Sequence, residues 1–159
     1  MIHDDLNTFA TALPPRSALA GLDLGTATIG VAVTDLTLSI ATPLLTIRRK
    51  KFTLDAAALQ EVLRARNIGG LILGLPRNMD GSEGPRAQST RAFARNLLPI
   101  VNLPLAFWDE RLSSVAAERA LLEADTSRKR RNQVIDHVAA SYILQGAIDR
   151  LRFMRTSNV

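Results

Sequence analysis

Short apolar runs separated by turn residues mark the first part of the chain. The runs LAGLDLG and IGVAVTD follow each other closely and are separated by Gly25 to Thr28, which is typical of a β-hairpin. Residues 40–47 predict a third strand, the run GGLILGLP a fourth and buried one, and residues 105–108 a fifth. The pattern therefore predicts five strands.

Apolar residues with helical spacing lie between these strands. Thr53 is placed to cap a helix that ends near Asn67, with an apolar face formed by Ala58, Leu59, Val62 and Leu63. Pro85 suits the first position of a second helix, whose inward face is formed by Thr90, Phe93, Ala94, Leu97 and Leu98. We expect both helices to pack against the strands.

The last third of the chain predicts two more helices. One begins at Ser113 or Ser114 and reaches about residue 123, residues 124–131 form a basic loop, and the final helix covers 132–152. Three strands followed by alternating helices and strands predict an α/β domain with a five-stranded mixed sheet flanked by helices, antiparallel at first and parallel later. We expect residues 18–152 to form this domain, 1–17 a flexible leader and 153–159 a tail.

The composition agrees with a folded domain and narrows its chemistry. Apolar residues make up 47% of the 159 residues and charged residues 22%, which excludes a disordered chain. The absence of cysteine excludes disulfides, thiolate zinc sites and thiol nucleophiles. No apolar run is long enough for a membrane span, and Asp4 and Asp5 lie where a secretion signal has positive charge. We expect a cytoplasmic protein.

An excess of basic residues predicts a polyanionic partner. Twenty Lys and Arg against fifteen Asp and Glu give a net charge of +5. The cations gather in two runs, residues 48–51 and residues 128–131, and neither run contains aromatic residues. Contacts to nucleic-acid phosphates are therefore expected rather than base stacking.

Asp23 is a carboxylate within an apolar strand, directly before the turn at Gly25. Such a group is costly to bury without a partner. It either binds a metal or phosphate, or accepts hydrogen bonds from turn amides. Asp109 and Glu110 directly follow another strand, and alternation allows only one of them to share the face of Asp23. The pattern does not choose between them, and a salt bridge to Arg111 is an equal alternative.

Asp136 is the third candidate carboxylate. It begins a helix face that continues with Ala139, Ala140, Ile143 and Ala147. A surface aspartate favoured by the helix dipole is the alternative. Three carboxylates form a hard oxygen site that suits Mg²⁺ or Mn²⁺, and two such ions about 4 Å apart can promote phosphodiester hydrolysis. His137 is expected to serve packing or lie at the surface.

Two loops are candidate phosphate-binding segments. Residues 76–85 include Arg77 and Asn78 and lead into a helix, where backbone amides can hold an anion, although an ordinary turn has the same composition. The run 128–131 immediately precedes the helix of Asp136 and is placed to neutralise flanking phosphates. A solvated loop is the alternative there.

Four motifs together resemble the YqgF (RuvX) family of pre-16S ribosomal RNA nucleases, which is related to RuvC-type Holliday junction resolvases. They are GLDLGTATIGVAVTD, GLPRNMDGSEGPRAQSTRAFARNL, DERLSS and RKRRNQVIDHVAASYILQGAIDR. The resemblance covers residues 20–150. It implies an RNase H-like fold, a bacterial cytoplasmic location and a role in maturing the 5′ end of 16S ribosomal RNA.

The resemblance also implies a set of site residues. The acidic positions of the family fall on Asp23, Glu110 and Asp136, and so favour Glu110 over Asp109 as a catalytic and metal-binding residue. The family usually has a basic residue where this chain has Thr28, which puts substrate affinity in question. The predicted nucleic-acid-binding residues are Arg77, Asn78, Arg111, Arg128, Lys129, Arg130 and Arg131.

Several functions stay open at the level of sequence. The first is a hydrolase that cleaves precursor 16S ribosomal RNA, and the second a junction resolvase that cleaves branched DNA. A non-catalytic RNA-binding ribosome-assembly factor is a third, and an ATP-binding domain of the actin and sugar-kinase group a fourth, although one domain is too short to enclose a nucleotide as those proteins do. The cut position and the oligomeric state, a homodimer included, also stay open.

Overall fold

The computed structural model describes the backbone of residues 1–112 and 128–157 and the side chains of residues 1–112 and 137–155. Its centre is one six-stranded mixed sheet in the order β1-β6-β5-β2-β3-β4. The strands are β1 (Ile2–His3), β2 (Ala18–Leu24), β3 (Thr28–Thr34), β4 (Ala41–Arg48), β5 (Ile68–Leu75) and β6 (Leu105–Asp109). β2, β3 and β4 pair antiparallel, whereas β2, β5, β6 and β1 pair parallel, which confirms the predicted mixed sheet.

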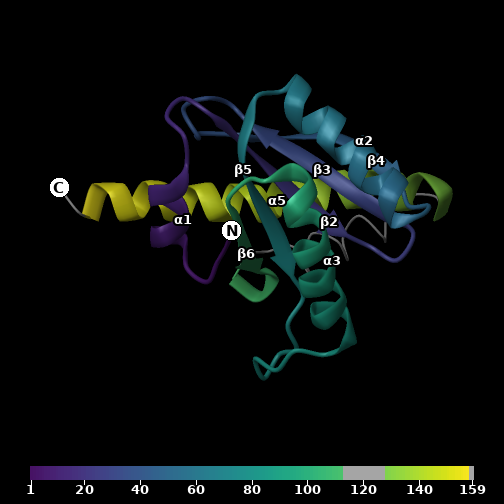
Figure 1. Cartoon of the computed structure of the whole chain (residues 1–159). Helices are drawn as coiled ribbons and strands as arrows, with labels where there is room; N and C mark the ends of the chain where they lie inside the picture. The colour runs from purple at the N-terminus through teal and green to yellow at the C-terminus, as the bar shows by residue number, and fades with distance from the viewer. Residues whose placement is uncertain (113–127, 158–159) are drawn as a thin grey trace.

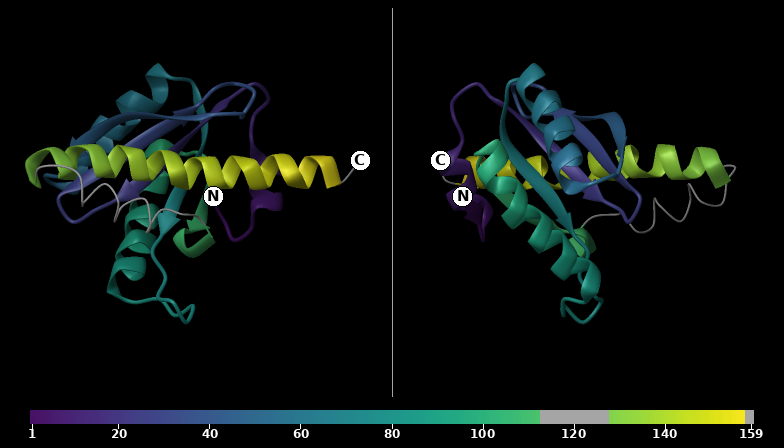
Figure 2. Two further views of the ribbon diagram at one scale, coloured as in Figure 1. Left: turned by 180° about the vertical axis from the view of Figure 1, so that it is seen from behind. Right: turned by 45° about the vertical axis from the view of Figure 1, so that its right-hand side comes forward.

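Helices cover both faces of this sheet, as Figures 1 and 2 show. The helical elements are α1 (Leu6–Ala12), α2 (Phe52–Ala65), α3 (Pro85–Val101), the 3₁₀ turn η1 (Glu110–Leu112) and α5 (Arg128–Ser157). α2 and α3 lie on one face, and the long α5 crosses the other. Among the described residues, no helix combines the length and apolar character needed to cross a membrane. The helix predicted from residue 113 or 114 to 123 lies outside the described residues.

Alternation along the strands divides the buried side chains into two layers. In β2, Ala20 and Leu22 pack with α2 and α3, whereas Leu19 packs with α5. The helices meet these layers through the faces predicted from spacing, with Leu59 and Leu63 of α2 buried. The buried residues of α3 and α5 also lie on the faces predicted from spacing: Thr90, Phe93, Ala94, Leu97, Ala139, Ala140, Ile143 and Ala147.

The N-terminal residues are part of the fold, so their expected role as a flexible leader is wrong. β1 pairs with β6 through Ile2 and Leu105, and forms the sixth strand. Asp5 caps α1 by accepting the backbone N–H of Thr8 at 2.8 Å. Phe9 of α1 is fully buried in the layer under α5. A strand of two residues and a helix of seven are too short to produce a recognisable period.

The final helix is longer at both ends than predicted. The expected loop over 124–131 is wrong for residues 128–131, which lie in α5, while residues 124–127 lie outside the described residues. The expected tail from residue 153 continues as helix to Ser157. Lys and Arg favour helix nearly as strongly as Ala does, and neither Gly nor Pro interrupts these two stretches, so their charge was a poor indicator of a loop.

Candidate active site

Asp23 lies at the carboxyl end of β2 and is 2% exposed. The residues two and four positions before it, Gly21 and Leu19, both face α5, because Leu19 packs in that layer and a side chain at Gly21 would meet Leu144. Alternation therefore directs Asp23 toward α5 as well. It is paired in register with Gly30 of β3. A carboxylate that is buried under a helix at the end of a strand is shielded from water, and this position suits a group that binds a ligand.

Glu110 follows β6 on the same face of the sheet. Ala106 and Trp108 pack in the layer of α5, whereas Leu105 and Phe107 pack in the layer of α2 and α3. Asp109, the last residue of β6, continues the second series. Glu110 lies in η1, beyond the alternation of the strand, and its carboxylate is on the α5 face because Oε1 lies beside the position that a Cβ of Gly74 would share with Ile143. The geometry thus separates two residues that the sequence pattern could not distinguish.

Gly74 of β5 lies between the strands that carry these two carboxylates. The pair Leu22 and Leu73 precedes Asp23 and Gly74 by one residue on each strand. A Cβ atom at Gly74 would lie 2.7 Å from Glu110 Oε1 and 2.5 Å from Cδ1 of Ile143 in α5. The Glu110 carboxylate therefore occupies the space above Gly74, next to the strand of Asp23, and the missing side chain makes that position available.

The third predicted carboxylate belongs to α5. The backbone of Asp136 is helical, and its side chain lies outside the described residues. One turn further on, Ala139 and Ala140 are buried against the sheet. Among the side chains that the structure describes, no group of three or more His, Cys, Asp or Glu residues is arranged to hold a metal ion.

Asp109 forms an ion pair on the other side of β6. Arg111 Nη2 lies 2.7 Å from Asp109 Oδ2, and its Nε lies 3.1 Å from both carboxylate oxygens. The hydrogen bonds from Arg111 hold the pKa of Asp109 below its usual range. The salt bridge to Arg111, which the sequence left open as an alternative role for these carboxylates, is therefore formed by Asp109.

The loop between β5 and α3 is closed by its own side chains. Asn78 Nδ2 donates to Ser82 Oγ at 3.0 Å, and Asp80 accepts the Ser82 backbone N–H at 2.9 Å. Glu83 binds Arg91 through two hydrogen bonds of 2.5 and 2.7 Å and lies 3.6 Å from Arg77. Three predicted nucleic-acid-binding residues, Arg77, Asn78 and Arg111, therefore already have partners within the protein.

The basic run 48–51 divides between the two faces of the sheet. Arg49 Nη1 donates to the carbonyl of Gly25 at 2.6 Å, and its guanidinium lies 5.7 Å from the ring of Phe93, so it secures the β2–β3 turn. Arg48 pairs across the ladder with Thr28, on the face of α5. The other basic run, residues 128–131, has side chains outside the described residues.

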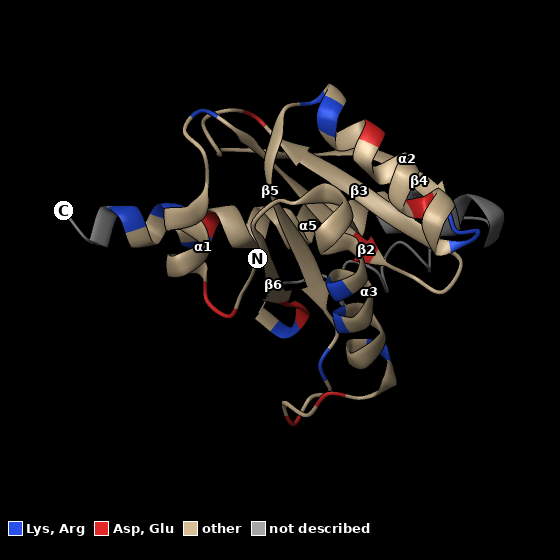
Figure 3. Ribbon diagram, in the orientation of Figure 1, with Lys and Arg blue, Asp and Glu red and all other residues tan. Residues whose placement is uncertain are grey.

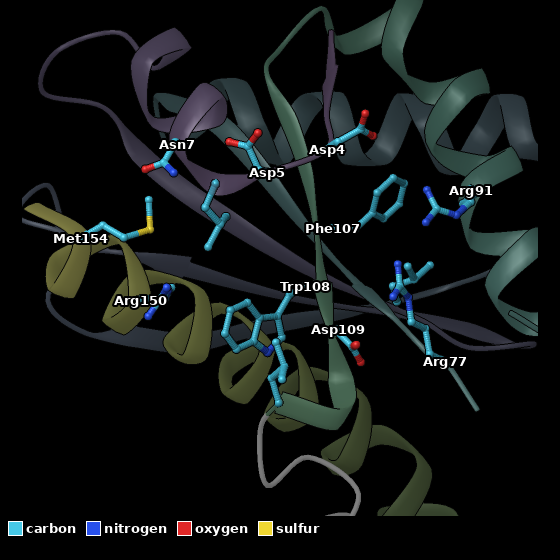
Figure 4. A pocket seen from close by; sticks show the side chains of 13 residues that line it. Asp4, Asp5, Asn7, Arg77, Arg91, Phe107, Trp108, Asp109, Arg150 and Met154 are labelled. Carbon is cyan, nitrogen blue, oxygen red and sulfur yellow. The ribbon is translucent and has the colours of Figure 1, made fainter. Parts of the chain in front are cut away.

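Sequence reasoning missed a pocket at the far edge of the sheet, shown in Figure 4. It has a volume of about 660 Å³, and Figure 4 shows Asp4 and Asp5 on one side of it, Arg77 and Arg91 on another and Arg150 on a third. β6 runs through its centre, with Phe107 on one side of the strand and Trp108 on the other. The pocket exists because the N-terminal residues fold against this edge, which spacing did not predict.

Comparison with known proteins identifies relatives along almost the whole chain. The family model described as RuvX, Holliday junction resolvase, matches residues 17–150. A protein of Ruegeria sp. (strain TM1040) is 70% identical over 99% of this chain and 100% of its own length, and one of Roseobacter denitrificans is 69% identical over 98% and 96%. Each is named as a proposed pre-16S rRNA nuclease.

The fold is also similar to that of a solved resolvase. RuvC of T. thermophilus, in complex with a Holliday junction substrate, matches with a TM-score of 0.53 at 12% identity, over 85% of this chain and 96% of RuvC. A second structure of Thermus thermophilus RuvC gives a TM-score of 0.51 at 12% identity, over 84% of this chain and 96% of RuvC. The six-stranded sheet with helices on both faces thus agrees with the predicted RNase H-like architecture. From the match over residues 17–150 and the full-length relatives, the chain belongs to the RuvX family.

Proposed function

We propose that the protein is a nuclease that hydrolyses phosphodiester bonds of nucleic acid, with Asp23, Glu110 and Asp136 as its catalytic residues. The observation that carries the proposal is the common face of Asp23 and Glu110, with Glu110 above the bare backbone of Gly74. Parallel strands place their carboxyl ends at one edge of the sheet, where sites of α/β proteins lie. α5, which carries Asp136, covers the same face.

The donor set fits a divalent cation such as Mg²⁺ or Mn²⁺. Asp23 and Glu110 offer carboxylate oxygens, which are the ligands these ions prefer, and Asp136 is proposed as the third. A bound ion would supply positive charge against the phosphate and favour ionisation of water. The chain itself holds Asp23 in place, because β2 is paired on both sides and the residue is almost fully buried. Substrate phosphates would be neutralised by the basic run 128–131 of α5.

Precursor 16S ribosomal RNA is the proposed substrate, and the cytoplasm the proposed location. The support is the name shared by the relatives at about 70% identity. A four-way DNA junction is the second candidate, favoured by the similarity in fold to RuvC. Both substrates present the same phosphodiester chemistry to the same carboxylates, so the choice depends on the surface around them.

Cleavage assays with purified protein test the proposal. Precursor 16S ribosomal RNA with its 5′ extension and a four-way DNA junction are incubated with Mg²⁺, Mn²⁺ or a chelator. Cleavage of the RNA is expected with either metal and not with the chelator. Asp23→Asn and Glu110→Gln are each expected to lower kcat by about 100-fold or more, because charge that stabilises the transition state is lost.

Asp109→Asn is the matched control for these substitutions. It removes an adjacent carboxylate that faces the other layer of the sheet, so cleavage is expected to stay within about threefold of wild type. Equal losses in Asp109→Asn and Glu110→Gln would refute the assignment of Glu110. RNA binding by wild-type protein without cleavage of either substrate would instead identify a non-catalytic assembly factor.

A further inference from the structure

A second polar pocket lies on the face covered by α5, at the outer side of the antiparallel strands. It has a volume of about 270 Å³ and is lined by Thr28 of β3, Thr46 and Arg48 of β4, and His137 of α5. His137 Nδ1 and Thr46 Oγ1 lie 2.8 Å apart, a hydrogen bond that joins α5 to β4. The functions discussed so far assign no role to this pocket.

The register of the strands places this pocket beside the carboxylate site. Asp23 pairs with Gly30, and Gly30 pairs with Thr46, so the three residues form one row across the sheet. Paired residues on neighbouring strands share a face, and neighbouring strands lie about 4.8 Å apart. Thr46 is therefore about 10 Å from Asp23, and the residue between them, Gly30, contributes no side chain.

Arg48 supplies the charge of the pocket. It is exposed at the end of β4 and pairs across the ladder with Thr28, two residues beyond the row of Asp23. Among the described residues, no carboxylate forms an ion pair with Arg48, in contrast to Arg77, Arg91 and Arg111. Figure 3 shows that basic residues continue from this strand end into the connection to α2.

The lining of the pocket suits one chemical group. A guanidinium donates several hydrogen bonds to the oxygens of a phosphate, and the Thr28 hydroxyl is a neutral donor. When the Thr46 hydroxyl donates to His137 Nδ1, the imidazole N–H lies at Nε2 and is a further neutral donor. The hydrogen bond to Thr46 fixes the plane of the His137 ring, so its Nε2 has a defined direction. The oxygens of a phosphodiester accept hydrogen bonds from such donors, so the pocket suits a backbone phosphate.

We propose that Arg48, together with His137, Thr28 and Thr46, binds a backbone phosphate of the nucleic-acid strand whose scissile phosphate lies at Asp23 and Glu110. The inference rests on the proposed nuclease function. The separation of about 10 Å between Asp23 and Thr46 places this phosphate on the same strand, a short distance from the cut. The subsite would fix the direction in which the strand crosses the sheet.

Binding measurements separate this subsite from a general attraction to basic residues. In an Asp23→Asn background, in which cleavage is expected to be slowed by about 100-fold or more, fluorescence anisotropy of a labelled 20-nucleotide single-stranded RNA is measured over a range of salt concentrations. Arg48→Gln is expected to weaken binding roughly fivefold and to reduce the salt slope of log K by about 0.7, the value for one phosphate contact on a single strand. Arg48→Lys is expected to recover part of the affinity.

Lys51→Gln is the matched control, because Lys51 belongs to the same basic run but does not line the pocket. Its affinity is expected to stay within twofold of the Asp23→Asn background. Equal weakening by Arg48→Gln and Lys51→Gln would overturn the subsite in favour of long-range attraction. No change in either variant would overturn it as well.

Kinetics in the cleaving protein give a second readout. Arg48→Gln alone is expected to raise KM and leave kcat nearly unchanged, because the subsite binds substrate and transition state equally. A fall in kcat with unchanged KM would overturn the assignment as a binding subsite. The binding assay does not depend on cleavage, so failure of the nuclease proposal and failure of the subsite have different signatures.

Discussion

At the scale of single residues, Gly74 shows how a missing side chain prepares a site. It lies near the carboxyl end of β5, between two parallel neighbours and under α5, and a methyl group there would overlap both Ile143 and the Glu110 carboxylate. Glycine weakens a strand interior, so its presence in a fully buried strand indicates a close approach of other groups. Here those groups are a helix and a candidate catalytic residue.

The substitution Gly74→Ala tests this role. It is expected to cost about 1–3 kcal/mol of stability through overpacking and to abolish cleavage by displacing Glu110. Gly21→Ala is the control, because its Cβ would lie 2.7 Å from Leu144 Cβ and disturb α5 without contacting Glu110. Thermal unfolding and cleavage are measured together, at a temperature where both variants are folded. Similar residual cleavage in the two would contradict a specific role for Gly74.

Asp35 organises the turn between β3 and β4. Its carboxylate accepts hydrogen bonds from the Thr37 hydroxyl and from the backbone N–H groups of Ser39 and Ile40. These bonds favour the charged form, that of Thr37 most strongly, and lower the pKa of Asp35 from 3.8 to about 2. Leu38, in the same turn, adopts a left-handed backbone conformation with φ of 55°.

The lowered pKa of Asp35 predicts a pH-dependent contribution to stability. Because its folded pKa lies below the unfolded value of 3.8, the stabilisation is complete above about pH 4 and is lost as the pH falls toward about 2. The difference in urea midpoint between wild type and Asp35→Asn is therefore expected to be constant at pH 5–7 and to shrink below pH 4. A difference that is independent of pH would contradict this prediction.

At the scale of elements, the N-terminal pair β1 and α1 completes the edge of the sheet. β1 covers part of β6, and α1 inserts Phe9 into the layer shared with α5, where it meets Leu19 and Ile72. His3 of β1 contacts the Phe9 ring edge to face, with centroids 6.2 Å apart. These contacts join the beginning of the chain to its last helix.

Phe9→Ala measures what this docking contributes. Removal of a fully buried phenyl group is expected to lower the free energy of unfolding by about 3–5 kcal/mol. Thr11→Ala, on the exposed side of the same helix, is expected to change it by less than about 1 kcal/mol. Urea denaturation followed by circular dichroism distinguishes them. Equal, small effects would mean that the N-terminal residues are dispensable for the fold.

At the scale of the whole molecule, long elements with a strong period were predictable and short ones were not. β2 to β6, α2 and α3 follow from alternation, helical spacing and turn residues, because each buries one regular face. β1 and α1 escaped, because they are stabilised by contacts with residues distant in sequence. Local pattern carries no information about such partners. The start of α5 escaped because its basic run was interpreted as a loop.

The candidate site divides in the same way. Asp23 was predictable as a carboxylate within a buried strand, but the preference for Glu110 over Asp109 came from family resemblance. The structure supplies the physical basis, since the face of each depends on how β6 is oriented beside β5. Arg48 was visible only as a member of a basic run. Its pairing with Thr28 depends on strand register, which composition does not encode.

The distance in sequence between β2 and α5 has a consequence for the protein's own synthesis. Most of one face of the sheet, including the strand of Asp23, is covered by a helix that is translated roughly a hundred residues later. At about 5–20 residues per second, the ribosome takes roughly 5–20 seconds to make that interval. During that time the nascent sheet lacks its cover, so the carboxylates cannot form a complete site. A protein proposed to cut ribosomal RNA would therefore acquire its cutting site only after α5 has been made.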